Sequence, residues 1–171
     1  FMITIIIDNR EKQLKTYFSE YENSEKYTFL YENLDLGDII IKKNDKIILV
    51  IERKTIDDLY SSIQDGRYKE QKIRLTNIFS KNQLLYLLEG NIRTLKTKYF
   101  KNYNSIVSGA LINTIYRDNI RVLRSINIEE TIDFILLLSK KIDKNLDFFV
   151  NINDNSNESN NSNESNNSNE S

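Results

Sequence analysis

The chain contains no cysteine and no histidine among its 171 residues. Without cysteine, it can form no disulfide, no thiolate nucleophile and no cysteine metal site. Without histidine, Ser-His-Asp catalysis, histidine general bases and most zinc chemistry are excluded. Catalysis would therefore depend on carboxylate, Lys, Arg, Tyr and Ser side chains, and a metal held by oxygen ligands alone would be Mg²⁺ or Mn²⁺.

Long apolar runs are also absent. No run approaches the roughly 18 residues that would suggest a membrane span, and no secretory signal is visible before Ile3. We therefore expect an intracellular protein with no membrane partner, and the sequence does not distinguish the nucleus from the cytoplasm.

The charged residues divide the chain into two parts. All 24 Lys and Arg residues lie before residue 151, whereas the segment 151–171 holds four acidic residues and repeats Asn, Ser and Glu. With 24 basic and 21 acidic residues, the segment 1–150 has a net charge of +3, which by itself says little about DNA. We expect one domain with a real core over residues 1–150 and a disordered tail over residues 151–171.

An apolar strand expected over residues 47–51 is followed directly by Glu52, Arg53 and Lys54. Side chains alternate between the two faces of a strand, so Glu52 and Lys54 point the same way and Arg53 points the other. A carboxylate and an ammonium at the end of a buried strand are costly to bury unless something uses them. A divalent metal would use the carboxylate of Glu52, and a scissile phosphate would use the ammonium of Lys54. The alternative is that Glu52 only forms an ion pair with its basic neighbours.

The dipeptide Gly37-Asp38 supplies a second carboxylate, at the start of another apolar strand. Asn44-Asp45 predicts a hairpin turn from this strand into the next one. The hairpin would make Asp38 and Glu52 neighbours although they are 14 residues apart in the sequence. A turn aspartate is the alternative role for Asp38.

A family resemblance is carried by Gly37, Asp38, Glu52, Arg53, Lys54 and Asp58. Together they resemble the GD…ERKxxxD motif in the nuclease domain of the xeroderma-pigmentosum group F (XPF) family of structure-specific DNA endonucleases. The following stretch IQDGRYKEQKIRL, residues 63–75, is similar to the branch of that family called the MUS-type crossover junction endonucleases. The Glu-x-Lys pair alone is a weak signal, whereas the complete string is a strong one.

The resemblance implies an α/β fold, with a mixed central β-sheet flanked by helices in a restriction-endonuclease-like core, over residues 1–150. It implies an endonuclease that uses Mg²⁺, with Mn²⁺ as its substitute, to hydrolyse flapped, forked or otherwise branched DNA. It also implies a homodimer, or a heterodimer with a related nuclease-fold chain. The alternatives are a non-catalytic DNA-binding subunit of a heterodimeric nuclease, and a restriction-type nuclease or RNase on the same core.

The expected site combines carboxylates with basic side chains. The predicted metal ligands are Asp8, Asp38 and Glu52, and the predicted catalytic residues are Asp38, Glu52, Lys54, Asp58 and Arg53. Lys54 can orient or deprotonate a water, or stabilise an oxyanion, whereas Arg53 would brace the site from the other side. Asp8 and Arg10 resemble the D-x-R-E element of the family, which implies a place near the metal. A solvated turn is their alternative.

The predicted DNA-binding residues are Arg10, Arg67, Gln71 and Arg74. The last three recur at i, i+4 and i+7 along one helix, and a solvated helix face is the alternative. Thr55 and Asp58 also fit a helix capping box, which is a structural alternative for Asp58. A basic and aromatic segment over residues 93–103 is a further candidate for DNA contact, although such loops are more often only solvated.

The apolar periodicity and the turn residues predict six strands and five helices. The strands are expected at residues 4–7, 27–32, 38–42, 47–51, 83–88 and 121–123, and the helices at 13–21, 55–63, 67–79, 103–115 and 127–143. The buried stripe is expected at Tyr68, Leu75, Ile78 and Phe79 in the third helix, and at Tyr103, Ile106, Val107, Ala110, Leu111 and Ile115 in the fourth. Asn127 and Glu130 are expected to cap the last helix.

The last helix is apolar on more than one side. Its apolar residues are Ile128, Ile132, Ile135, Leu136 and Ile142 toward one side, and Phe134, Leu137 and Leu138 toward another. One face can pack on the sheet, which leaves a second face to bury. We therefore expect a dimer through the C-terminal helices; the alternative is that both faces belong to the core.

Overall fold

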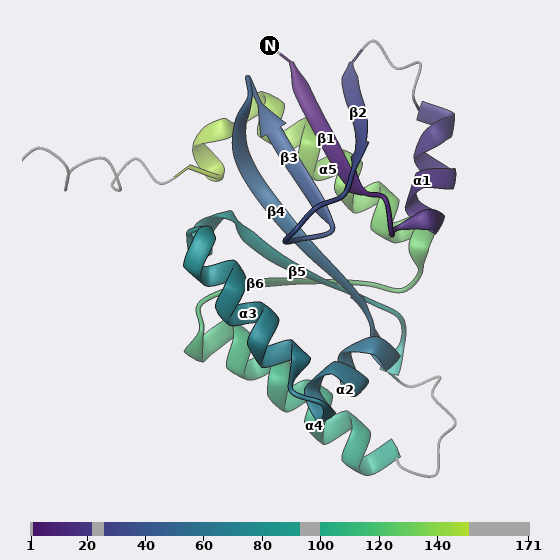
Figure 1. Ribbon diagram of the computed structural model, residues 1–171, viewed down its shortest axis with the longest axis vertical. Helices are drawn as coiled ribbons and strands as arrows, with labels where there is room; N and C mark the ends of the chain where they lie inside the picture. Colours follow the sequence, from purple (N-terminus) through teal and green to yellow (C-terminus); the bar gives the residue numbers. More distant parts are fainter. Residues whose placement is uncertain (1, 22–25, 93–99, 151–171) are drawn as a thin grey trace, which may run out of the picture.

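The computed structural model describes residues 2–21, 26–92 and 100–150 (Figure 1), apart from the side chains of residues 100–102. The tail over residues 151–171 and most of the basic and aromatic segment lie outside these ranges, so both expectations stay predictions. In the part of the chain that the structure describes, none of the helices combines the length and the apolar composition that a bilayer crossing requires.

The described residues form one mixed sheet. Its strands are β1 (Ile3–Asp8), β2 (Tyr27–Glu32), β3 (Ile39–Lys43), β4 (Lys46–Thr55), β5 (Leu84–Glu89) and β6 (Arg121–Ser125). Their order across the sheet is β2-β1-β3-β4-β5-β6. β1 runs parallel to β2 and antiparallel to β3, β3 and β4 form an antiparallel hairpin, and β4, β5 and β6 run parallel. The predicted mixed sheet is confirmed.

Helices cover both faces of this sheet (Figure 1). They are α1 (Lys12–Phe18), α2 (Ile56–Gln64), α3 (Arg67–Ile78), α4 (Phe100–Ile112) and α5 (Ile128–Lys144). α1 and α5 share one apolar core with the sheet, whereas α2, α3 and α4 share a second. Successive strand residues divide between the two cores: in β4, Val50 faces α2–α4 and Ile51 faces α1 and α5.

The turn between β3 and β4 has the chemistry that its sequence predicts. Asn44 and Asp45 have φ angles of 50° and 63°. Two successive left-handed residues are what a type I′ turn requires, and Asn and Asp tolerate this conformation better than other non-glycine residues. The turn holds β3 and β4 as an antiparallel hairpin.

The open end of this hairpin positions Asp38. The register pairs Ile39 with Ile51, and the backbone N–H of Asp38 donates to the carbonyl oxygen of Ile51 at 2.9 Å. Gly37 has a φ of 79°, and a Cβ atom there would lie 2.6 Å from a methyl group of Val50. Glycine is therefore required where the chain enters β3, and Asp38 comes to lie beside the acidic residue that follows Ile51.

α3 differs from the prediction in the side that it buries. Its buried residues are Tyr68, Lys72 and Leu75. Ile78 is 67% exposed, because at 3.6 residues per turn it lies roughly 90° around the helix from that stripe. The prediction that Ile78 is buried was wrong. Lys72 takes an inward position because its ammonium donates to Thr114 Oγ1 and Asp118 Oδ2, both at 2.7 Å.

α4 also departs from the predicted helix near its end. It stops at Ile112 and continues as a π-helical turn over Asn113–Arg117. The wider turn changes the direction of the later side chains, so Thr114 is buried and Ile115 is exposed. The predicted burial of Ile115 was therefore wrong.

Other differences concern the ends of elements. β4 continues as a strand through Thr55, and α1 gives way to a 3₁₀ turn over Ser19–Tyr21. The cap predicted for α5 is confirmed, because Asn127 Oδ1 accepts the backbone N–H of Glu130 at 2.9 Å. The extension of β4 matters for function, since strand alternation then also governs residues 52–54.

Candidate active site

Asp38 and Glu52 lie side by side on the face of the sheet that α2, α3 and α4 cover. Asp38 immediately precedes β3, and Glu52 lies within β4, where it is 3% exposed. The Asp38 carboxylate is held by the backbone N–H of Arg53, which donates to its Oδ2 atom at 2.8 Å. The hairpin thus brings together the two carboxylates that the sequence predicts as neighbours.

The two oxygen atoms of Glu52 have different surroundings. Oε1 accepts hydrogen bonds from Gln71 Nε2 at 2.7 Å and from Lys54 Nζ at 3.3 Å. Oε2 is buried and has no hydrogen-bond partner among the described residues. A buried carboxylate oxygen without a donor is costly, so Oε2 is the atom at which a cation or a proton would be stabilised.

The electrostatics of this pair follow from its burial. For Asp38, burial is the largest cause that raises the pKa and the charge of Glu52 is the next, while the N–H of Arg53 lowers it. For Glu52, burial again raises the pKa most, against the opposing effects of Lys54 and Gln71. A hydrogen bond with the side chain of Asp38, which only a protonated Asp38 can donate, also lowers the pKa of Glu52. Two carboxylates enclosed together repel each other, so a proton or a cation between them is favourable.

The pair fits a hard divalent cation. Among the described residues, no group of three or more His, Cys, Asp or Glu residues is arranged to hold a metal ion. Mg²⁺ does not require such a group, because it is usually bound by one or two carboxylates together with water and substrate phosphate oxygens. Asp38 and Glu52, with its unpartnered Oε2 atom, are two such carboxylates.

Asp8, the third predicted ligand, is held by Arg10. Its Oδ1 accepts the backbone N–H and the Nε–H of Arg10, both at 2.8 Å, and its Oδ2 accepts from Arg10 Nη2 at 2.7 Å and from the backbone N–H of Leu34 at 3.0 Å. The side-chain hydrogen bond from Arg10 is the largest cause that lowers the pKa of Asp8. Both oxygens already have donors. The assignments of Asp8 to a metal and of Arg10 to DNA stay predictions.

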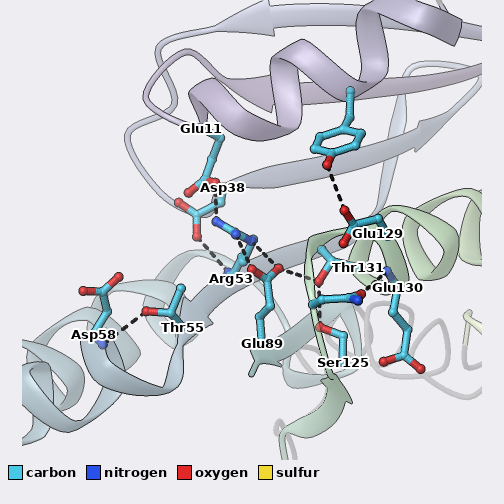
Figure 2. A network of polar contacts seen from close by, with 12 residues as sticks. Glu11, Asp38, Arg53, Thr55, Asp58, Glu89, Ser125, Glu129, Glu130 and Thr131 are labelled. Carbon is cyan, nitrogen blue, oxygen red and sulfur yellow. Dashed lines mark hydrogen bonds and ion pairs between the residues drawn. The ribbon is translucent and has the colours of Figure 1, made fainter. Parts of the chain in front are cut away.

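The side chain of Arg53 lies on the opposite face of the sheet from Glu52, as strand alternation predicts, and Figure 2 shows its contacts there with Glu11 and Glu89. Its Nε and Nη2 donate to Glu89 at 3.0 and 2.7 Å, and its Nη1 donates to Glu11 at 2.8 Å. The guanidinium is thus enclosed by two carboxylates, and its connection to the acidic pair is the backbone hydrogen bond to Asp38. Its predicted catalytic role is not tested by this arrangement.

Asp58 lies at the start of α2 and is exposed. Its backbone N–H donates to the side chain of Thr55 at 3.3 Å, which is the helix cap that the sequence offers as a structural alternative (Figure 2). The Asp58 carboxylate takes no part in the hydrogen bonds of the Asp38 and Glu52 carboxylates described above. Its catalytic role stays a prediction without a contact to support it.

The three residues of α3 that were predicted to bind DNA differ in their surroundings. Gln71 points toward the sheet and holds Glu52. Arg67 is exposed and forms an ion pair with Asp65 at 2.6 Å, and Arg74 is exposed. Contact of Gln71 with DNA stays untested, but the structure gives it a second role beside the acidic pair.

The sequence gives no role to Glu89 and Thr131, and it names Glu11 only as the last residue of the D-x-R-E element. Glu89 follows the strand expected over residues 83–88, yet it is half of the ion pair with Arg53, and Thr131 Oγ1 donates to it at 2.6 Å. The parallel pairing of β4 with β5 aligns Thr55 with Glu89. Had the sequence analysis paired these two strands in parallel, it would have predicted that Glu89 lies close to Arg53.

A model of the ERCC4 domain family matches residues 7–138. The chain belongs to the ERCC4 domain family. The matched region runs from the end of β1 into α5 and contains the acidic pair, Lys54 and the residues around Arg53. The resemblance to the XPF family, in its MUS-type branch, is confirmed.

Two relatives illustrate this branch. "Probable crossover junction endonuclease mus81" from Dictyostelium discoideum is 34% identical over 159 residues, which cover 81% of this chain and 17% of that protein. "Structure-specific endonuclease subunit MUS81" from Rattus norvegicus is 35% identical over 97 residues, which cover 56% of this chain and 16% of that protein. The chain thus spans about a sixth of the length of these relatives.

A solved structure has the same fold. XPF from Aeropyrum pernix, in complex with DNA, matches with a TM-score of 0.64 at 19% identity, over 82% of this chain and 65% of that chain. The match confirms the predicted fold, a mixed sheet flanked by helices.

Proposed function

We propose that this domain is a metal-dependent, structure-specific endonuclease that hydrolyses phosphodiester bonds in flapped, forked or otherwise branched DNA. The observation that carries the proposal is the pair of a half-buried Asp38 and a buried Glu52 with its unpartnered oxygen, in a family whose relatives bear endonuclease names. Lys54, 3.3 Å from Glu52, adds the basic group that such hydrolysis can use.

Asp38 and Glu52 would hold Mg²⁺, with Mn²⁺ as its substitute. When bound, the ion supplies a water of lowered pKa and stabilises the negative charge that develops on the phosphate. Asp8 would join the ligands only if Arg10 released its carboxylate.

The side chains around the pair have separate tasks. Gln71 and Lys54 engage Oε1 of Glu52, which leaves Oε2 for the cation. Lys54 shares the face of β4 with Glu52, so it can orient or deprotonate the attacking water, or stabilise the charged phosphate. Arg53 acts from behind, because its side chain is enclosed and its backbone N–H holds Asp38.

Exposed arginines would bind the DNA backbone. Arg67 and Arg74 lie on α3, the helix that also carries Gln71, and Arg10 lies at the end of β1. Contacts of this kind fix the position of the duplex without reading its sequence. Recognition of branched DNA would then depend on the shape of the backbone around the acidic pair.

The outer face of α5 would pair with a second nuclease-fold chain, as a homodimer or a heterodimer. Leu137 is 51% exposed there. A hollow of about 420 Å³ beside it is lined by Tyr21, Tyr27, Leu136 and Leu137, with Asp133 and Lys140. An apolar surface with polar residues at its margin is typical of a protein interface. The relative from rat is itself named a subunit.

A substrate panel tests the proposed function. Labelled flap, fork, linear duplex and RNA substrates are incubated with the chain in Mg²⁺ and in EDTA. We expect cleavage of flap and fork DNA in Mg²⁺ and none in EDTA. Equal cleavage of linear duplex would indicate a restriction-type nuclease, cleavage of RNA alone an RNase, and binding without cleavage a DNA-binding subunit.

A further inference from the structure

A line of hydrogen bonds on the far face of the sheet runs from β6 to Arg53 (Figure 2). Ser125 Oγ lies 2.6 Å from Thr131 Oγ1, which donates to Glu89 Oε2 at 2.6 Å. Glu89 accepts two further hydrogen bonds from the guanidinium of Arg53, at 3.0 and 2.7 Å. Because Thr131 gives its only hydroxyl proton to Glu89, Ser125 must be the donor to Thr131. The direction of every bond is thus defined.

This network fixes the orientation of the Arg53 side chain more than it stabilises the folded protein. The side chains of Arg53 and Glu89 are 9% and 10% exposed. Ion pairs buried to this degree lose hydration, and well-packed apolar residues often stabilise a protein equally well. A bidentate arginine and carboxylate pair does fix the mutual orientation of the two groups. Glu11 encloses the third side of the guanidinium at 2.8 Å.

Arg53 transmits this geometry to the acidic pair. It stands between Glu52 and Lys54 in β4, and its backbone N–H donates to Asp38 Oδ2 at 2.8 Å. A movement of Arg53 would therefore displace Asp38 directly and both neighbours along the strand. Glu89 of β5 holds the guanidinium together with Glu11, and Thr131 of α5 holds Glu89 in turn. These contacts therefore help to determine where the end of β4 lies.

We propose that Glu89 and Thr131 are positioning residues, which hold Arg53 and thereby keep the Asp38 and Glu52 carboxylates in the geometry that binds the metal. The inference rests on the proposed function, which assigns the metal to these carboxylates. Substitution of a group that directly contacts a metal ligand commonly changes metal affinity or activity about 10–100-fold. Arg53 is such a group. Glu89 and Thr131 lie one and two contacts further from Asp38, so their effect should be at the lower end of this range or below it.

The test compares Glu89→Gln and Thr131→Val with the wild-type chain. Mn²⁺ affinity is measured by calorimetry, DNA affinity by anisotropy without metal, and the cleavage rate in single turnovers on flap DNA. Both variants are expected to lose up to about tenfold in Mn²⁺ affinity and in rate, with the larger loss in Glu89→Gln, and to keep a DNA affinity within about twofold of the wild-type value. Thr131→Ser keeps the hydroxyl and should therefore keep the wild-type Mn²⁺ affinity and cleavage rate.

Two matched controls have the same chemistry elsewhere on α5. Ser139→Ala removes a buried hydroxyl that donates to the backbone of Ile135 at 2.8 Å. Asp143→Asn removes the charge of a carboxylate that lies 3.6 Å from Lys43 Nζ, at the opposite end of β3 from Asp38. Both controls are expected to bind Mn²⁺ and to cleave DNA like the wild-type chain.

The outcomes separate the inference from the proposed function. If the wild-type chain neither binds Mn²⁺ nor cleaves DNA, the proposed function fails and the inference fails with it. If the wild-type chain does both, and Thr131→Val matches it or the controls lose as much as the variants, the positioning role alone is overturned. Glu89→Gln leaves the positive charge of Arg53 with one carboxylate partner fewer and is expected to lower the Tm. If it does not fold, Thr131→Val decides, since it keeps the ion pair.

Discussion

The side-chain amide of Gln71 donates a hydrogen bond of 2.7 Å to Oε1 of Glu52. This contact joins α3 to β4 across the face of the sheet that carries both carboxylates. Because Oε1 is engaged, the carboxylate can rotate little, and Oε2 stays directed toward the place where a cation would bind. Gln71 therefore bears on metal binding even if it also contacts DNA.

Removal of this amide should weaken catalysis more than DNA binding. We expect Gln71→Ala to lower the single-turnover cleavage rate about 10–100-fold, the range for a partner behind a metal ligand. DNA affinity, measured by anisotropy in EDTA, should change little. Asn77→Ala, at an exposed position of the same helix, serves as the control. A loss of DNA affinity equal to the loss of rate would show that Gln71 is a DNA contact only.

Asp38→Asn should abolish cleavage and yet stabilise the metal-free protein. A raised pKa means that the folded state binds the proton more tightly than the unfolded state. The free energy of unfolding of the wild-type chain should therefore fall as the pH rises through that raised pKa. In EDTA at about pH 8, we expect the variant to melt about 2–4 °C higher, which corresponds to about 1 kcal/mol at this chain length.

The comparison of the wild-type chain with Asp38→Asn at lower pH provides a control. The difference in Tm should shrink as the pH is lowered below the raised pKa, because Asp38 is then protonated in the folded wild-type chain as well. Asp35→Asn, at an exposed position, should leave the Tm unchanged at either pH. A lower Tm for Asp38→Asn at about pH 8 would contradict the repulsion between the two carboxylates.

Substitution of Lys54 should lower the cleavage rate and leave DNA affinity unchanged, whereas substitution of Arg74 should do the opposite. Lys54→Ala is expected to lose about 10²–10⁴-fold in rate, the usual contribution of a group that acts in proton transfer, with DNA affinity retained. Arg74→Ala should weaken DNA binding, reduce its salt dependence by about one phosphate contact, and leave the rate at saturation unchanged. A parallel loss of rate and binding in Lys54→Ala would reduce Lys54 to a phosphate anchor.

If the chain dimerises through α5, its mass in solution should change when Leu137 is substituted. Light scattering at tens of micromolar should give a dimer for the wild-type chain. Leu137→Glu places a charge on the exposed apolar face and should give a monomer with an unchanged Tm. Lys69→Glu, at an exposed position of α3 on the other side of the sheet, is the control for added negative charge and should leave the dimer intact. A wild-type monomer, unaffected by Leu137→Glu, would leave only pairing with a different chain.

Local sequence patterns predict the centre of the site well. A hairpin turn and a side-chain period of two residues suffice to place Asp38 beside Glu52 and to direct Arg53 to the other face. Neither inference requires knowledge of how the helices pack. The strands were predicted within a few residues for the same reason.

Contacts between distant segments were not predictable in this way. The contact of Glu89 with Thr131 joins residues 42 positions apart, and it exists only because α5 starts close to the end of β5. The error at Ile115 follows from the π-helical turn, which apolar periodicity does not anticipate, and the error at Ile78 follows from the burial of a lysine. Apolar periodicity assumes that lysine faces water, whereas Lys72 is buried against partners that lie on another element.

The central claim is that the Asp38 and Glu52 pair binds the metal that drives DNA hydrolysis. Its most direct test is the single-turnover rate of flap DNA cleavage as Mg²⁺ is titrated, measured for the wild-type chain and for Glu52→Gln. The proposed mechanism predicts a saturable Mg²⁺ dependence for the wild-type chain, no cleavage in EDTA, and no measurable cleavage by Glu52→Gln at any Mg²⁺ concentration. Cleavage in EDTA, or near-normal cleavage by folded Glu52→Gln, would contradict it.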